Sequence, residues 1–215
     1  MDNNIKKYHQ AFLLFTIAQL FMMLGLFQYG GSIKALAGIL SVFSLFQDIA
    51  FILMITAAVK LHEFNKNYFY AFITSIICLF ISILATIAKE STEDMTVAWG
   101  RGLGVSSDIL LCVAYAYFFL GSKDRFKELE LNKNVRRSRL GFIIVIVLTI
   151  VINLMSFIGS FNIVKTNYLV AAIFRYGGIA MRFTMYTFMF VIVLTMLIDM
   201  KKNIKEEEHN EEEQK

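Results

Sequence analysis

Long, nearly uninterrupted runs of apolar residues dominate this chain, and short polar segments separate them. One of these runs, Ala35 to Val59, contains a single charged residue along its whole length. The hydrocarbon core of a bilayer is about 30 Å thick and a helix rises about 1.5 Å per residue, so about 20 apolar residues span it. The bilayer offers no water to unpaired backbone groups, which favours helices. The pattern therefore predicts an all-α, multi-pass membrane protein.

Six transmembrane helices are predicted from the apolar runs. The last apolar stretch is interrupted by Gly177, Gly178 and Arg182, so Tyr168 to Tyr176 is predicted as an interfacial or re-entrant lead-in to the sixth span. The six predicted spans are Ala11–Phe27, Ala35–Val59, Tyr68–Ala88, Ala98–Leu120, Leu140–Ser160 and Gly177–Ile198.

The domain organisation is predicted to be simple. Residues 1–10 form a polar N-terminal segment, residues 11–200 a single membrane domain, and residues 201–215 a charged tail that we expect to be solvated and disordered. Fifteen of the 21 Lys and Arg residues lie in the two terminal segments and in the second and fourth connections. Because cytoplasmic loops carry an excess of Lys and Arg, both termini are predicted to be cytoplasmic, with the chain in the cell membrane.

Aromatic and basic residues near the span ends give further expectations. Tyr29, Trp99 and Tyr176 fall near predicted outer ends and Tyr68 near an inner end, as in the aromatic belts of membrane proteins. The longest hydrophilic connection is predicted at Gly121–Arg139. Its seven Lys and Arg residues either lie on anionic lipid headgroups or simply set the orientation of the chain.

The six spans can be grouped as three helical hairpins, which are possible repeats. Asn65-Lys66-Asn67 and Asn132-Lys133-Asn134 follow the first two returning spans. Repeats of two-helix units would place the returning helices at equivalent positions in the bundle. The alternative is that apolar helices resemble one another by composition alone.

Three charged residues lie inside the predicted spans. Asp48 lies halfway along the second span, Asp108 lies about 15 Å from the start of the fourth, and Arg182 lies about 7.5 Å from the start of the sixth. An acidic or basic side chain at a helix centre costs roughly 2.5–3.5 kcal/mol on insertion scales. Both acids are therefore expected to face the bundle interior, paired, protonated or next to water. Arg182 is expected to be shallow enough to snorkel.

Two explanations account for these charges. In the first, they fix helix packing through an ion pair or through hydrogen bonds to buried polar groups. In the second, Asp48, Asp108, Asn153 and Arg182 form a site for a small solute, a cation or a proton, with Arg182 suited to an anionic group. A transporter or substrate-capture protein predicts a polar cavity that reaches the acids. A non-catalytic membrane subunit, which assembles with or regulates partner proteins, predicts a filled interior with paired acids.

Composition and the absence of known motifs argue against several classes of function. Only 18% of the 215 residues are charged and the mean hydropathy is +0.61, whereas about a quarter of a typical soluble domain is charged. The net charge of +4 arises from the basic connections, so no nucleic acid partner is expected. No catalytic motif is present, and His9, His62 and His209 lack metal-ligand spacing. Neither an enzyme nor a bound cofactor or metal is predicted.

No motif in the sequence identifies a family. The predicted arrangement is six helices in a chain of about this length, with both ends in the cytoplasm. In outline, it is similar to that of the small substrate-capture subunits of energy-coupled vitamin uptake systems. The resemblance implies capture of a small solute within the membrane, and it rests on the number and direction of helices alone. The expected partners are the lipid bilayer, a small solute or ion, and another membrane protein.

Overall fold

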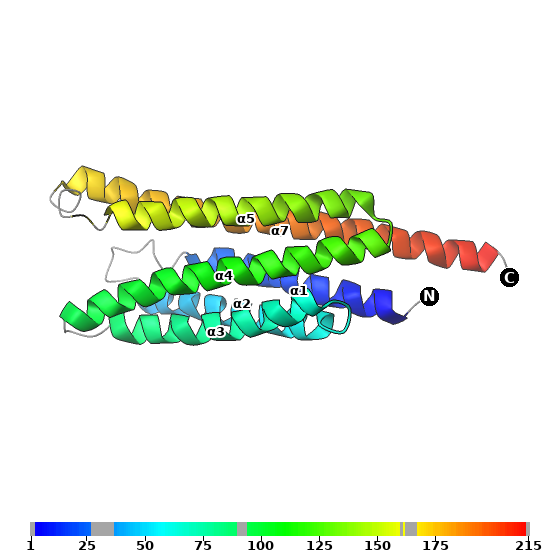
Figure 1. The fold of residues 1–215 in the computed structure, drawn as a ribbon, viewed down its shortest axis with the longest axis horizontal. Coiled ribbons are helices and arrows are strands. Elements are labelled where there is room, and N and C mark those ends of the chain that lie inside the picture. Colours follow the sequence, from blue (N-terminus) through cyan, green and yellow to red (C-terminus); the bar gives the residue numbers. More distant parts are fainter. Residues whose placement is uncertain (1–2, 27–36, 90–93, 160, 162–166, 214–215) are drawn as a thin grey trace.

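The described part of the chain is built from α-helices. The computed structural model describes residues 3–26, 37–89, 94–159, 161 and 167–213. Successive helices run in opposite directions along one axis (Figure 1). The all-α prediction is confirmed for these residues. The helices are α1 (Asn3–Gly25), α2 (Ala37–Leu61), α3 (Lys66–Lys89), α4 (Asp94–Glu128), α5 (Asn132–Gly159) and α7 (Tyr168–Glu213).

The helices form a ring in chain order. Each helix packs against the next along the chain, and α7 packs back against α1, which closes the ring. Aromatic side chains reach across the interior between α1 and α4. Phe15 of α1 stacks on Phe118 of α4, with ring centroids 3.6 Å apart and an interplanar angle of 4°. The interior between these two helices is therefore filled by rings.

Helix α1 shows why one stripe of each helix is buried. Its buried side chains recur every three or four residues, which places them on one face of a helix. Small residues in the stripe, Ala11 and Ala18, let neighbouring helices approach closely. Tyr8 is only 1% exposed. The segment predicted as a separate polar N-terminus thus forms, from Asn3 onward, the first turns of α1.

Five helical segments in the described part of the chain are long and apolar enough to cross a membrane. They are Lys6–Gly25, Lys66–Ala88, Gly102–Glu128, Asn132–Gly159 and Tyr168–Asn203. Helix α2 is a further long helix of 25 residues, and a sixth crossing stays a prediction.

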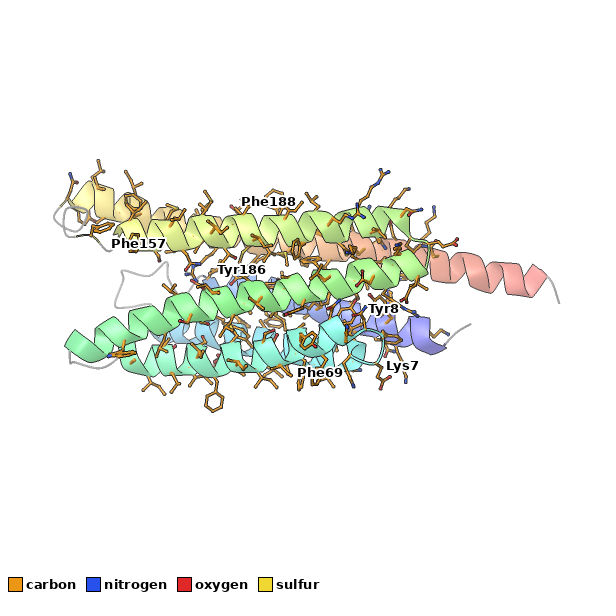
Figure 2. All side chains as sticks on the ribbon, in the orientation of Figure 1. Lys7, Tyr8, Phe69, Phe157, Tyr186 and Phe188 are labelled. Atoms are coloured by element: carbon orange, nitrogen blue, oxygen red, sulfur yellow. The ribbon has the colours of Figure 1, made fainter. Side chains whose placement is uncertain are left out.

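The outer surface of the bundle carries many large apolar side chains. Phe69, Phe157 and Phe188 point away from the helices in Figure 2, and they are 45%, 63% and 49% exposed. Soluble proteins rarely expose continuous apolar faces. The exterior is therefore compatible with contact with lipid.

Both ends of the described chain lie at the same end of the bundle, as an even number of crossings requires (Figure 1). Their cytoplasmic location stays a prediction. Trp99 and Tyr176 are 70% and 52% exposed, as residues of an aromatic belt would be. Tyr29 lies outside the described residues. The belt assignment of Tyr68 is wrong, because its side chain is fully buried in the core.

The predicted hydrophilic connection Gly121–Arg139 is also wrong. Helix α4 continues to Glu128 and α5 begins at Asn132, so only three residues lie between them. Glu130 has the left-handed φ of 56°. Its N–H donates to the Lys127 carbonyl at 3.2 Å, and the Leu131 N–H donates to the Phe126 carbonyl at 2.9 Å. These two bonds form a Schellman motif, which satisfies the last carbonyls of α4.

The two Asn-Lys-Asn triplets both lie where a helix begins. Asn65 precedes α3, and its Oδ1 accepts a hydrogen bond from the Asn67 N–H at 2.8 Å, as an N-cap residue does. Asn132, in contrast, is already the first residue of α5. The two triplets therefore differ in register by one residue, and the threefold repeat stays a prediction.

Helix α7 corrects the predicted start of the last span. It is a single helix of 46 residues that begins at Tyr168, nine residues before the predicted start, and continues to Glu213. Its last turns project beyond the bundle in Figure 1, so the tail predicted to be disordered is helical. Gly177 faces α5, where a Cβ would lie 2.6 Å from Cε at the flexible end of the Met155 side chain. A glycine inside a helix costs only about 1 kcal/mol, which contact with α5 can offset.

Candidate functional site

Two of the predicted intramembrane charges meet inside the bundle. Arg182 of α7 donates from Nη1 to Asp108 Oδ1 of α4 at 2.9 Å, and from Nη2 to Asp108 Oδ2. The Arg182 and Asp108 side chains are 27% and 19% exposed. Two parallel N–H···O bonds match the planar guanidinium to the carboxylate, and such a pair fixes orientation as well as distance.

Both partners of this pair lie deep along their helices. Asp108 and Arg182 each lie fourteen residues after the first residue of the helix, at 94 and 168, a rise of about 21 Å. The depth of Arg182 in a membrane stays a prediction, because the start of a helix does not mark a membrane surface. The predicted span start at Gly177 left out the first turns of α7.

The pair joins two helices that are not neighbours in the ring. Helix α4 packs against α3 and α5, and α7 packs against α5 and α1. The Asp108–Arg182 pair therefore links the two helices that flank α5 in the ring. Asp108 is paired, which is one of the states expected for it. Removing one partner of a buried pair leaves an uncompensated charge, which typically costs 3–5 kcal/mol.

Asn153 lies at the same level of the bundle on α5. The Thr149 hydroxyl of α5 contacts Met185 Sδ of α7 at 3.8 Å, and Asn153 and Arg182 each lie about one turn beyond that contact toward the same end. The Asn153 side-chain amide donates to the Thr149 carbonyl at 2.9 Å. Its Oδ1 is buried without a hydrogen-bond partner. Asn153 thus lies near the depth of the ion pair, with one acceptor unused.

Asp48 does not face the bundle interior, and that expectation is wrong. The buried face of α2 includes Ala50, Phe51 and Met54. Asp48 lies outside this buried face and is exposed. Of the four predicted site residues, the structure brings Asp108 and Arg182 into contact, places Asn153 near their level, and leaves Asp48 on the outer surface.

A chain of hydroxyl groups near the N-terminus of α1 was not predicted. Tyr8 of α1 is hydrogen-bonded to Tyr68 of α3 at 2.5 Å, Tyr68 donates to Ser122 of α4 at 3.1 Å, and Ser122 donates to the Phe118 carbonyl at 2.7 Å. Tyr8 lies among the helices at this end of the bundle in Figure 2. All three side chains are buried, so these bonds satisfy polar groups and tie three helices together.

A second unpredicted cluster joins α5 to α7. Arg137 of α5 forms an ion pair with Asp199 of α7 and donates to the Thr195 carbonyl at 3.3 Å. Asn134, which is 1% exposed, donates to the Met196 carbonyl at 3.3 Å. Arg137 lies in the connection predicted to contact lipid headgroups or to set orientation. Asp199 is an acid near the end of the last apolar run. That position was the sequence signal that could have suggested this pair.

Two of the hollows on the described surface are not lined by Asp108, Asn153 or Arg182. One, of about 380 Å³, lies between α1 and α7 and is lined mostly by apolar side chains, among them Met23, Leu26 and Phe183. The other, of about 360 Å³, lies beside the α4–α5 connection and is lined by polar residues such as Asn132 and Lys202. Among the described residues, no group of three or more His, Cys, Asp and Glu side chains could hold a metal ion.

Comparison with protein-family models, with curated proteins and with solved structures finds no match to this chain.

Proposed function

We propose that this chain is a non-catalytic membrane subunit that assembles with or regulates a partner membrane protein. The observation that carries the proposal is the paired state of Asp108 and Arg182. Each charge satisfies the other through two hydrogen bonds, and the pair holds α4 against α7. Charges used in this way stabilise one arrangement of the helices and leave little charge to bind a solute.

The packing of the interior supports the same proposal. Between α1 and α4 the space is filled by aromatic rings such as Phe15 and Phe118. Neither described hollow is lined by a residue of the pair. A transporter of a polar solute needs a path for water or solute to its charged groups. A subunit that acts through a partner needs only a stable scaffold and an outer surface.

Thiol accessibility tests the proposal directly. Cys78 of α3 is a free, fully buried thiol that donates to the Ser107 carbonyl at 3.2 Å, next to Asp108 in the chain. In a Cys112→Ala variant in lipid vesicles, Cys78 reports water access beside the ion pair. We expect a charged, membrane-impermeant thiol reagent, added from either side, to leave Cys78 unmodified. Modification in detergent that unfolds the chain shows that the thiol itself is competent.

The matched positive control places the thiol at an exposed position. Trp99 is 70% exposed, at the end of the bundle opposite the termini. A Trp99→Cys variant that also carries Cys78→Ala and Cys112→Ala has its only thiol at this position. This thiol should react rapidly. If Cys78 in the folded chain reacts at a comparable rate, a water-filled path reaches the pair, and the subunit proposal is contradicted.

Capture or transport of a small solute or ion is the second candidate. Two buried polar atoms without hydrogen-bond partners favour it, Asn153 Oδ1 and Gln19 Nε2. Gln19 is fully buried, and its Oε1 accepts a hydrogen bond from Tyr115 at 2.7 Å. Unused buried acceptors and donors are where a polar ligand or a water would bind. Rapid modification of Cys78, slowed by a bound solute, is the result this candidate predicts.

A further inference from the structure

The outward face of α2 carries a carboxylate within an apolar stripe. Asp48 is exposed, and Leu45, Ile49 and Ile52 around it are 56%, 40% and 57% exposed. Leu45 and Ile52 lie three and four residues from Asp48, so they share its face of the helix, and Ile49 lies beside it. Helix α2 packs against α1 and α3 through its other side. The carboxylate therefore points away from the ring.

Asp48 lies too far from both helix ends to reach water easily. It is eleven residues from Ala37 and thirteen from Leu61, which corresponds to about 16 Å and about 20 Å. Long Lys and Arg side chains can snorkel to the membrane surface, but the short side chain of aspartate cannot. In a bilayer the carboxylate would lie near the middle of the hydrocarbon core, where an unpaired charge is strongly disfavoured.

Asp48 differs from the other intramembrane acids in having no partner among the side chains that the structure describes. Asp108 is paired with Arg182, and Asp199 with Arg137. Among the described side chains, none forms a hydrogen bond or ion pair with the Asp48 carboxylate. Intramembrane ionisable residues are generally paired, so a partner from outside the chain is expected.

We propose that this face of α2 docks a transmembrane helix of another protein that carries a Lys or Arg near mid-membrane, which pairs with Asp48. The proposal rests on the proposed function and names the chemistry of the partner. Charge complementarity selects a basic helix over a second copy of this chain. Two copies that met through this face would bring two carboxylates together, and like charges in a low-dielectric medium repel.

A model helix tests the pairing without knowledge of the natural partner. The probe is a leucine–alanine transmembrane peptide of about 25 residues with one central Arg, incorporated with the full chain in phosphatidylcholine vesicles. Energy transfer between labelled peptide and labelled chain measures association. We expect the Arg peptide to associate with the parent chain and a matched peptide with central Leu not to do so. Asp48→Asn should weaken association by roughly five- to thirty-fold.

Photocrosslinking locates the docked peptide. A photoreactive residue at position 52 should crosslink to the Arg peptide, whereas the same residue at position 150 should not. Ile52 of α2 and Ile150 of α5 are matched in exposure, at 57% and 54%, but lie on different helices. A charge swap, Asp48→Lys with a central-Asp peptide, should restore the association that each change alone abolishes.

Several results would overturn the docking proposal. One is equal association of the Arg peptide with the parent and with Asp48→Asn, and another is equal crosslinking from positions 52 and 150. Energy transfer between two labelled copies of the chain that is lost in Asp48→Asn would identify a second copy as the occupant instead. If Cys78 stays protected while the peptide fails to bind, only the docking proposal fails. Rapid modification of Cys78 contradicts the proposed function itself.

Discussion

Arg182 and Asp108 lie 74 residues apart in the chain and meet through a forked ion pair between α7 and α4. Each is at the same distance from the start of its helix, so the helices are in register where the charges meet. Because α4 and α7 are not neighbours in the ring, this contact adds a connection that chain-order packing does not supply. The pair therefore connects the two helices on either side of α5.

Asp48 provides the matched contrast to Asp108. Both are aspartates far inside apolar helices, but Asp48 makes no ion pair with a described side chain. Asp48→Asn should leave the thermal stability of the isolated chain in detergent unchanged or raise it, because a charge without an internal partner is removed. Thermal unfolding of the variant and the parent measures this. A large loss of stability would show that Asp48 supports the fold, and the docking proposal would lose its basis.

Two helical glycines should respond in opposite ways to alanine. A Cβ at Gly141 would lie 2.5 Å from the ring of Phe119, which is fully buried. Gly141→Ala should therefore destabilise the fold by about 1–3 kcal/mol through overpacking. At Gly178 nothing lies within 4 Å of such a Cβ, so Gly178→Ala should stabilise α7 by about 1 kcal/mol. Unfolding measurements on the two variants give the sign of each change in stability. Changes of the same sign in both variants would contradict the packing described.

The hydroxyl chain at the N-terminal end of α1 should stabilise the fold through Tyr68, its central residue. Tyr68→Phe removes the bonds to both Tyr8 and Ser122, and it leaves the Tyr8 hydroxyl buried without its acceptor. We expect a loss of about 1–3 kcal/mol. Tyr70→Phe is the control, because Tyr70 is 44% exposed on the same helix. Equal effects of the two changes on unfolding would show that the hydroxyl chain contributes nothing specific.

The end of α4 contains a residue in a conformation that favours glycine. Glu130 occupies the left-handed position of the Schellman motif with φ 56°. Glu130→Gly should raise stability by about 1 kcal/mol, because glycine adopts this φ without steric cost. Glu130→Ala should bring no gain, because alanine is strained in the same way. Chemical or thermal unfolding distinguishes the two. A gain with alanine would show that the benefit comes from loss of the acidic side chain.

Hydrophobic patterning predicted where most helices lie but not where they end. Apolar run length reports the thickness of the membrane, whereas a helix continues through any residues that favour it. Lys127 and Glu128 are good helix formers, so α4 continues beyond its apolar run without a sequence signal for its end. Gly177 and Gly178 suggested a break, but the space at Gly177 is used by Met155 of α5. Only the three-dimensional structure shows that the helix continues through this glycine and faces α5 there.

The sequence also could not predict whether each acid faces the interior or the exterior of the bundle. Gln47 precedes Asp48, and Ser106 and Ser107 precede Asp108, but these few polar residues do not mark which side of each helix turns inward. Burial is decided by neighbouring helices that are distant in the chain. The sequence suggested an ion pair among the three charges without saying which acid Arg182 would contact, and the Arg137–Asp199 pair was not predicted.

The most direct test of a structural role for the central ion pair is a double-mutant cycle. Asp108→Asn, Arg182→Gln and the double variant are unfolded in detergent, together with the charge swap Asp108→Arg with Arg182→Asp. Each single change should cost about 3–5 kcal/mol, and the double variant should cost less than the sum of the two. The swap should recover part of the loss. Single variants as stable as the parent would contradict a structural tie, and would show that the fold does not need these charges.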